Sequence, residues 1–380
     1  MKQDSTIVSE SQKMPLGKLF IRMCENALAL QLSDGSMPPG HNGPHMDPET
    51  PVRNTSHWLI AFGKAWELSG GKKFREAALA CLGYLKGPEA RPGNGAFWHR
   101  KNPKKDFSNG VMGQAWTLEA LICSARIFDD SDAASLAEEV FNLHPYDSKI
   151  QAWGILDLNG KPVGPDRTFN HQLWFASMGC RLTKMGYSTV SAASTDFVRS
   201  IHKNIGYYKD GVIRHNPYGY TRQNSLRKWA GAQLHGLKHT LRPDPKAYSH
   251  SVGYHAFNTY ALHAIHQIVP DAPVFKQKTF RKSLRVFRSP AFRKHIENAR
   301  FGFPYNPPGI EAAVSIQSAD FLTKEERTQT GQYWLNRQFR QNFDSSDFSM
   351  TKNTSDPLTY QARIYELYQL DSFDFEIDIP

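Results

Sequence analysis

The stretch TSHWLIAFGKAWELSGGKKFREAALACLGYL, from Thr55 to Leu85, contains the unit that determines the predicted fold. Apolar residues recur at helical spacing on both sides of the turn Ser69-Gly70-Gly71-Lys72, whose two glycines interrupt the helical pattern. The stretch therefore predicts two antiparallel helices joined by a short turn. Each helix has an apolar face that further elements of the chain must cover.

Similar helical hairpins recur along the chain. The turn Asp129-Asp130-Ser131-Asp132 joins another pair, and successive pairs follow one another about every 50–60 residues, which indicates a repeat architecture. This series predicts an all-α fold, an (α/α)6 or (α/α)7 toroid (a closed barrel of helical hairpins) in which the first helix of each pair forms the inner wall. Strand signals are short, at 155–158 and 211–213. The predicted helices cover residues 16–32, 55–68, 74–85, 109–128, 133–143, 169–184, 189–205, 252–268, 276–287, 310–321, 324–342 and 358–369.

The ends and the cysteines of the chain bound its organisation. One ring accommodates residues 1–380 as a single domain, with residues 1–15 as a flexible N-terminal tail. The polar segment from Met1 to Lys18 has no apolar signal-peptide core, and no apolar run is long enough to span a membrane, so we expect a cytoplasmic protein. The cysteines are far apart in apolar contexts, which predicts core residues and no metal site or cofactor. The sequence does not specify the oligomeric state.

The charge balance indicates the class of partner. Lys and Arg total 46 against 36 Asp and Glu, a formal charge of +10. A basic protein suits an acidic polymer. Because the chain has no zinc-finger spacing, no ribonucleoprotein motif and no Lys/Arg block, we expect an acidic polysaccharide or oligosaccharide as partner and not a nucleic acid. The richest basic segment, residues 276–300, is typical of a solvated helix.

The irregular segment 33–53 is rich in Pro, Gly and His. A long loop of this composition is more often functional than a linker. His41, His45 and Asp47 match no familiar metal-binding spacing, so we favour a role in lining the mouth of a substrate site.

Polar and aromatic residues gather at or near the starts of the predicted inner helices. In a toroid the loops before these helices converge at one mouth, and flat aromatic faces with polar donors are typical of a carbohydrate cleft. Each residue taken alone could instead be a cap or a core residue. The predicted substrate-binding set is Arg53, Asn54, His57, Trp58, Asn109, Gln114, Trp174, Arg242, His255, Tyr305 and Glu311.

The segment Thr168-Phe169-Asn170-His171 precedes an apolar helix. Thr168 is a candidate N-cap, which places Asn170 and His171 in the first turn, where unpaired N–H groups and the helix dipole favour an anionic group. The alternative is that Asn170 caps the helix and His171 is a half-buried structural histidine.

A second segment, residues 248–262, carries the other candidate groups. Helical spacing places His250, Tyr254 and Asn258 on one face of a helix. Arg242 lies upstream, and a tyrosine beside Arg and protonated His loses its proton more easily than in water. The alternative is that Tyr254 belongs to an aromatic packing stripe with Phe257 and Tyr260.

The two segments together resemble the (α/α) toroid alginate lyases, in the motif Phe169-Asn170-His171-x-x-Trp174 and in the Tyr254-His255 helix. In the wider group of toroid lyases, which includes glucuronan lyases, Asn neutralises the uronate carboxylate, His or Tyr removes the C5 proton, and Tyr protonates the leaving oxygen. The resemblance therefore implies a polysaccharide lyase that acts by β-elimination, with Asn170 as neutraliser, His171 as base or orienter, and Tyr254 as acid/base. The sequence departs from those lyases in the arginine that they place closely before the Tyr, since the nearest upstream arginine here is Arg242, with His250 in between. His250, which flanks Tyr254, is included with the candidate catalytic residues.

Other activities remain open on the same residues. The segment Asn109–Trp116, with Gly113-Gln114-x-Trp116, resembles the unsaturated glucuronyl hydrolases, and glycosidase chemistry needs two carboxylates. The chain also resembles uncharacterised proteins of glycan-assembly clusters. A uronate epimerase shares the C5 proton abstraction, and a non-catalytic glycan-binding toroid presents the same aromatic mouth. The candidate carboxylates for a hydrolase are Asp106, Asp166, Glu119 and Glu311.

Overall fold

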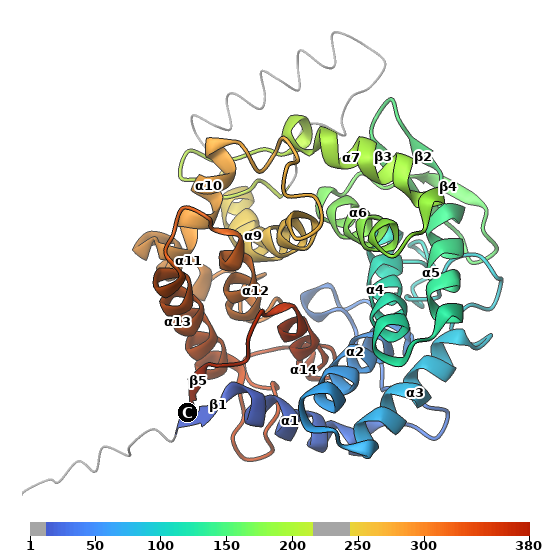
Figure 1. Ribbon diagram of the computed structural model, residues 1–380, viewed down its shortest axis with the longest axis horizontal. Helices are drawn as coiled ribbons and strands as arrows, with labels where there is room; N and C mark the ends of the chain where they lie inside the picture. The colour runs from blue at the N-terminus through green and yellow to red at the C-terminus, as the bar shows by residue number, and fades with distance from the viewer. Residues whose placement is uncertain (1–12, 216–243) are drawn as a thin grey trace, which may run out of the picture.

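The computed structural model describes residues 13–215 and 244–380, and in these ranges the chain forms a closed ring of helices (Figure 1). Each inner helix packs against the next along the ring, and the last packs back against α2. Predicted Arg242 lies outside the described residues. The inner helices are α2 (Val52–Ser69), α4 (Gly110–Phe128), α6 (Phe169–Lys184), α9 (Pro245–His266), α12 (Pro308–Ser315) and α14 (Pro357–Ala362), the last continued by the 3₁₀ helix η7 (Arg363–Gln369).

A second layer of helices surrounds this inner wall (Figure 1). Helix α3 packs on α2, α5 on α4, α7 on α6, α11 on α9, and α13 on α12. The predicted all-α toroid is therefore confirmed, in its (α/α)6 form. The outer helices are α1 (Leu16–Ala27), α3 (Lys72–Lys86), α5 (Ser131–Leu143), α7 (Ser191–Asn204), α10 (Lys278–Arg285), α11 (Pro290–Glu297) and α13 (Lys324–Asn342).

Two small antiparallel sheets complete the described structure. Strands β2 (Tyr146–Asp147), β3 (Ala152–Leu156) and β4 (Pro162–Pro165) form a meander before α6. Strand β1 (Lys13–Pro15) pairs with β5 (Glu376–Asp378), with Met14 opposite Ile377. The prediction of a flexible tail is therefore wrong for residues 13–15, because this pairing ties them to the far end of the chain.

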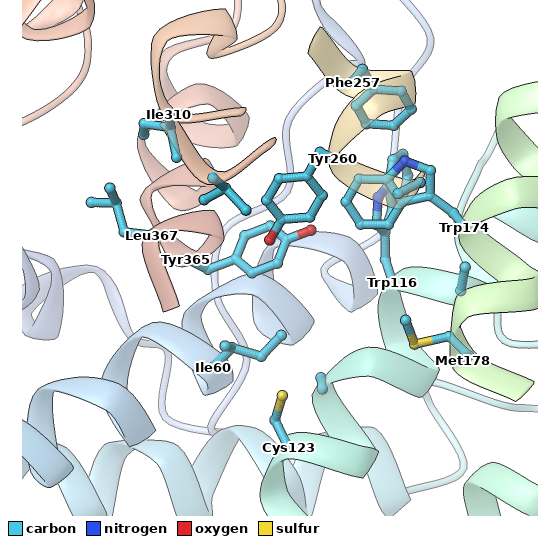
Figure 2. Close-up of a cluster of buried hydrophobic side chains, with 14 of the residues drawn as sticks. Ile60, Trp116, Cys123, Trp174, Met178, Phe257, Tyr260, Ile310, Tyr365 and Leu367 are labelled. Atoms are coloured by element: carbon cyan, nitrogen blue, oxygen red, sulfur yellow. The ribbon is translucent and has the colours of Figure 1, made fainter. Parts of the chain in front are cut away.

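Aromatic side chains fill the middle of the ring, between the inner helices (Figure 2). Trp174 stacks on Phe257 and on Tyr260, with ring centroids 4.8 and 5.1 Å apart. Cys24, Cys81, Cys123 and Cys180 are buried free thiols, which confirms their prediction as core residues. None of the described helices is both long and apolar enough to cross a membrane.

Helix α9 differs most from the sequence prediction. It begins at Pro245, seven residues before the predicted start at Val252, because the Asp244 carboxylate accepts hydrogen bonds from the N–H groups of Lys246 and Ala247. Proline at the first helical position is compatible with such a cap. Tyr254 consequently lies in the third turn of the helix and not at its start.

Candidate active site

A cavity of about 270 Å³ opens where the first turns of the inner helices and their preceding loops meet. Its walls come from segments far apart in the sequence, as expected for the mouth of a toroid. Its lining residues are mainly polar or cationic, with Met112, Trp116 and Phe257 as the apolar exceptions. The others are Asn42, His45, Arg53, Arg100, Lys105, Asn109, Thr168, Asn170, His171, His215, Tyr254, Tyr305, Asn306 and Arg363.

His171 and Asp166 form a hydrogen-bonded pair at one wall. Nδ1 of His171 lies 2.8 Å from Oδ2 of Asp166, and the histidine side chain is 24% exposed whereas the carboxylate is buried. Asp166 also accepts hydrogen bonds from the N–H groups of Val111 and Thr168, both at 3.0 Å. An orienting carboxylate on Nδ1 leaves Nε2 available as an acid or base.

The pKa of Asp166 is lowered. Burial alone would raise it, but the neighbouring His171 and the N–H donors of Thr168 and Val111 outweigh that effect. The carboxylate therefore stays ionised and fixes the orientation of the imidazole.

Gly110 allows α4 to approach this pair closely. Its φ is +58°, and a Cβ there would lie 2.2 Å from Oδ2 of Asp166 and 3.1 Å from Nδ1 of His171. The preceding Asn109 also has a left-handed backbone, with φ of +57°. Only a glycine combines this backbone with this space.

Asn170 and His171 lie in the first turn of α6, as predicted. Asn170 is 4% exposed, and its Oδ1 accepts the N–H of His171 at 3.1 Å. Thr168 occupies the N-cap position but makes no side-chain cap hydrogen bond. Asn170 is therefore not the N-cap residue, and its side chain lines the cavity.

Aromatic and imidazole rings form another part of the wall. The ring centroids of Tyr254 and His215 are 4.3 Å apart, and His215 stacks on His250 at 4.1 Å. Burial raises the pKa of Tyr254 well above 10, with a further contribution from its hydrogen bond to Tyr305. This shift runs opposite to the predicted easy loss of the proton, because burial favours the neutral phenol. Burial lowers the pKa of His215 to about 3.

Cationic side chains approach the cavity from two directions. Arg53 donates to Asn42 and Glu49 at 3.1 and 3.0 Å, and its guanidinium lies over the Trp116 ring, 4.0 Å from the centroid. Lys105 contacts the buried Asp47 at 3.1 Å. Every acidic partner of these cations lies behind the cavity wall.

Arg363 is held in a buried cluster of charges. Its guanidinium contacts Glu311 at 2.7 Å and Glu366 at 2.6 Å, and it donates to Oδ1 of Asn306 at 2.7 Å. Burial raises the pKa of Glu311, and it raises the pKa of Glu366 to about 7, against the lowering effect of Arg363. All three nitrogens of the Arg363 guanidinium are thus engaged by protein groups, and the side chain also lines the cavity.

No carboxylate occurs among the described lining residues. Asp106 pairs with Arg100 and accepts the N–H of Gly110. Glu119 is buried in the middle of the ring, where Tyr368 donates to it at 2.6 Å. Asp166 and Glu311 lie behind His171 and Arg363. The described residues also contain no group of three or more His, Cys, Asp or Glu that could hold a metal ion.

The structure brings six predicted site residues to the cavity: Arg53, Asn109, Asn170, His171, Tyr254 and Tyr305. His250 contacts the lining residue His215 from outside the cavity. The other described members of the predicted set lie in the core, where internal contacts hold them. Hydrogen bonds join Asn54 to the carbonyl of Pro38, Gln114 to the carbonyls of Phe97 and Ser108, and His255 to the carbonyl of Ser283. Ring stacking joins His57 to Tyr365, Trp58 to Phe62, and Trp174 to Tyr260. Glu311 forms an ion pair with Arg363.

Several lining residues are missing from the predicted set. His45 belongs to the loop already predicted to line the mouth, and Phe257 and Asn306 lie in segments that carry predicted residues. Arg100, His215 and Arg363 have no sequence signal of this kind, because only the closed ring brings them near His171.

Nearly the whole chain is similar in sequence to one curated archaeal protein. The chain is 39% identical over 372 residues to "Archaeal glycosylation protein Q" of Haloferax volcanii, and the match covers 96% of this chain and 99% of that protein. No model of a known protein family matches the chain.

Solved structures share the fold at low sequence identity. The cellobiose 2-epimerase from Bacillus thermoamylovorans B4167 has a TM-score of 0.62 and 11% identity, over 93% of this chain and 98% of that one. An unsaturated glucuronyl hydrolase specific for heparin has a TM-score of 0.58 and 13% identity, over 93% of this chain and 94% of that one. At this identity the likeness establishes the toroid fold alone.

Proposed function

The chain belongs to the family of the archaeal glycosylation protein Q, and from this premise we propose that it is a carbohydrate-active enzyme of glycan assembly. We propose further that it removes the proton at C5 of a uronic acid residue. The observation that carries this proposal is the Asp166–His171 pair, which faces a cavity rich in cations and amides.

The charge of the cavity supports an anionic sugar as substrate. Arg53, Lys105 and Arg363 are among the lining residues, and no described lining residue is acidic. A carboxylate that binds among such donors loses much of its negative charge, which acidifies the proton on the adjacent carbon. The cavity volume of about 270 Å³ suits one sugar residue more than a long polymer segment.

The proposed reaction has two proton transfers, one by His171 and one by Tyr254. Nε2 of His171 takes the C5 proton while Asp166 stabilises the resulting imidazolium. The electron pair of the broken C–H bond moves into the carboxylate group, whose charge Asn170 and the arginines stabilise. Tyr254, with its raised pKa, is the proton donor for the second step.

The second step defines two candidate outcomes. If Tyr254 returns a proton to C5 on the opposite face, the product is the C5 epimer and the glycan stays intact. This is our first candidate, because glycan assembly calls for a change that keeps the glycosidic bond. If the C4 oxygen leaves instead and takes the proton, the product carries a C4–C5 double bond, the β-elimination that the Asn170, His171 and Tyr254 motifs support.

The described lining residues include no carboxylate, which argues against hydrolysis. Glycosidases use a pair of carboxyl groups that flank the bond. The carboxylates nearest the cavity among the described residues are engaged by Arg363, Arg53 and His171. The described residues therefore offer no free pair of carboxyl groups for a glycosidase mechanism.

Proton exchange in heavy water tests the proposal. We expect the protein to replace the C5 hydrogen of glucuronate-containing oligosaccharides with deuterium, measured by NMR. New ultraviolet absorbance from a C4–C5 double bond identifies elimination, and deuterated product without that absorbance identifies epimerisation. If no uronic acid substrate exchanges or eliminates, the proposed reaction is wrong and a binding role becomes the better hypothesis.

Two variants test the assignment of the base. His171→Asn should lower the exchange rate by about 10²- to 10⁴-fold, the usual contribution of a general base. His202→Asn, on the outer helix α7, is the matched control and should keep the wild-type rate. Unchanged exchange in His171→Asn would show that another group removes the proton.

A further inference from the structure

A second and larger cavity lies at the opposite mouth of the ring. Its volume is about 940 Å³, and the last turns of the inner helices supply most of its lining. The inner helices run between the two mouths, so α6 carries His171 at one end and Arg181 near the other. The polar lining residues include Lys64, Glu67, Arg126, Arg181, Tyr368 and Gln369.

The aromatic core separates this cavity from the first one. Figure 2 shows Trp116, Trp174, Tyr260 and Tyr365 between the inner helices. Trp116 lines the first cavity, whereas Tyr260 and Tyr365 are buried and line neither one. The second cavity is therefore a separate space from the one that contains His171.

Arg181 is the notable group of the second cavity. Its side chain is 20% exposed, and its Nε has no hydrogen-bond partner among the described residues. The nearest carboxylate oxygen, Oε1 of Glu119, lies 3.8 Å from Nη2, which is too far for a hydrogen bond. A nearly buried guanidinium whose donors are left unused is costly unless something else accepts from them.

Glu119 does not take that role, because other donors already occupy it. Tyr368 and Gln369 donate to its Oε1 at 2.6 and 3.2 Å, and Tyr365 donates to its Oε2 at 3.4 Å. Glu119 therefore balances the charge of Arg181 without satisfying its hydrogen bonds.

The helix ends give Arg181 a second electrostatic partner but no hydrogen bond. The carboxyl ends of the inner helices carry partial negative charge, which a cation in the last turn offsets. At the rim, Glu67 engages Lys64 and Arg126 at 3.7 and 2.9 Å. Arg181 thus lines a roomy space while its buried Nε has no acceptor among the described residues, and Asp129 and Asp371, which also line that space, form no ion pair with it.

We infer that the mouth opposite His171 is a second ligand site, in which Arg181 binds the carboxylate or phosphate group of a small polar molecule. A guanidinium fork matches both groups, with two parallel N–H to oxygen hydrogen bonds. The cavity has room for a sugar-sized body attached to that group. This site is independent of the reaction proposed at His171.

NMR of the arginine Nε–Hε groups in the full, ¹⁵N-labelled chain tests the inference directly. The resonance that disappears in Arg181→Lys belongs to Arg181. It should shift and saturate on titration with inorganic phosphate, with glucuronate, or with both. A shift with phosphate alone identifies a phosphorylated ligand, and a shift with glucuronate alone identifies a sugar acid. Glucose, which has no charge, is the negative control.

Two matched variants distinguish specific anion binding at Arg181 from a general effect of losing one positive charge. Arg181→Gln should weaken anion binding about tenfold or more, the effect of losing hydrogen bonds to a charged group. Arg340→Gln, which removes an arginine at an exposed position of the outer helix α13, should change it less than about twofold. Equal losses in both variants, or an Arg181 resonance that neither anion moves, would overturn the inference.

Diffraction provides a test that needs no variant. Crystals of the wild-type protein soaked in selenate, an analogue of phosphate, should show an anomalous peak beside the Arg181 guanidinium. Selenate bound elsewhere on the protein and absent from this cavity would contradict a phosphate site, and glucuronate would then have to move the Arg181 resonance for the site to stand.

Discussion

At the scale of single residues, the candidate site depends on a close contact that one glycine permits. Gly110 lets the backbone of α4 reach Asp166, whose Oδ2 accepts the N–H of Val111. The same oxygen orients His171. The position of the imidazole therefore depends on a residue that has no side chain.

Gly110→Ala should disturb both stability and the pair. The added Cβ meets Asp166 at 2.2 Å on a left-handed backbone, so we expect a destabilisation of about 1–3 kcal/mol and a loss of the proposed proton exchange. Urea unfolding and the deuterium assay measure these effects. Gly83→Ala is the control, because its Cβ meets nothing within 4 Å, and it should stabilise α3 by about 0.5–1 kcal/mol. Full exchange activity in Gly110→Ala would contradict this account of the pair.

The carboxyl groups beside Arg363 make a prediction about pH. The pKa of Glu366 is raised to about 7 in the folded protein, above its value of about 4.3 in an unfolded chain. The folded state therefore binds the proton more tightly. The stability linked to this group is fully present below about pH 4 and is lost as pH rises through 7.

Glu366→Gln removes that pH-dependent loss. We compare the free energy of unfolding of the variant with that of wild type at each pH. The difference, variant minus wild type, should be higher at pH 8 than at pH 5 by on the order of 2–3 kcal/mol. Urea denaturation of both proteins at the two pH values measures the difference. Thr328→Ala, at an exposed position of α13, changes no titratable group and should show no such pH dependence. A difference that stays constant between pH 5 and 8 would mean that Glu366 ionises normally.

At the scale of elements, two inner helices fix their preceding loops by the same device. Gln172 of α6 accepts the N–H of Trp153 and donates to the carbonyls of Trp153 and Asp166. Gln114 of α4 does the same with Phe97 and with the carbonyl of Ser108. Gln114 was predicted to bind substrate, and the structure gives it this internal role.

The two glutamines allow a matched comparison. Gln172→Leu and Gln114→Leu each remove three hydrogen bonds and leave buried backbone groups unpaired, so each should cost on the order of 2–4 kcal/mol. Only Gln172 anchors the backbone of Asp166, so Gln172→Leu should reduce proton exchange much more than Gln114→Leu. Thermal unfolding measures the loss of stability in each variant, and the deuterium assay measures the loss of proton exchange. Equal activity losses would mean that the fixed loop before α6 has no special part in orienting His171.

Local signals explain which elements the sequence could predict. Helix α13 has the predicted bounds Lys324–Asn342, and in the structure Thr323 and Glu326 form a capping box at its start. The predicted 358–369 helix is divided into α14 and η7. The start of α9 was missed because Asp244 and Pro245 stand apart from the apolar pattern that guided the prediction.

At the scale of the whole molecule, the repeat of hairpins was enough to predict the closed ring. The Asn170, His171 and Tyr254 motifs were enough to place three candidate groups at one mouth. The sequence could not predict that Arg363 or His215 joins them, because no local pattern records which segments the closed ring brings together. It also could not separate Trp116, which lines the cavity, from Trp174, which packs in the core, since each stands two residues after a glutamine of an inner helix.

The way the ring closes also bears on how the protein is made. Strand β1 pairs with β5, and α14 packs on α2, so the seam of the ring joins the first and last parts of the described chain. During synthesis the early hairpins can pack on one another as they leave the ribosome, but the seam must wait for the C-terminal segment. Because the His171 cavity includes both Asn42 and Arg363, the nascent chain acquires its site only after the segment with Arg363 has been synthesised.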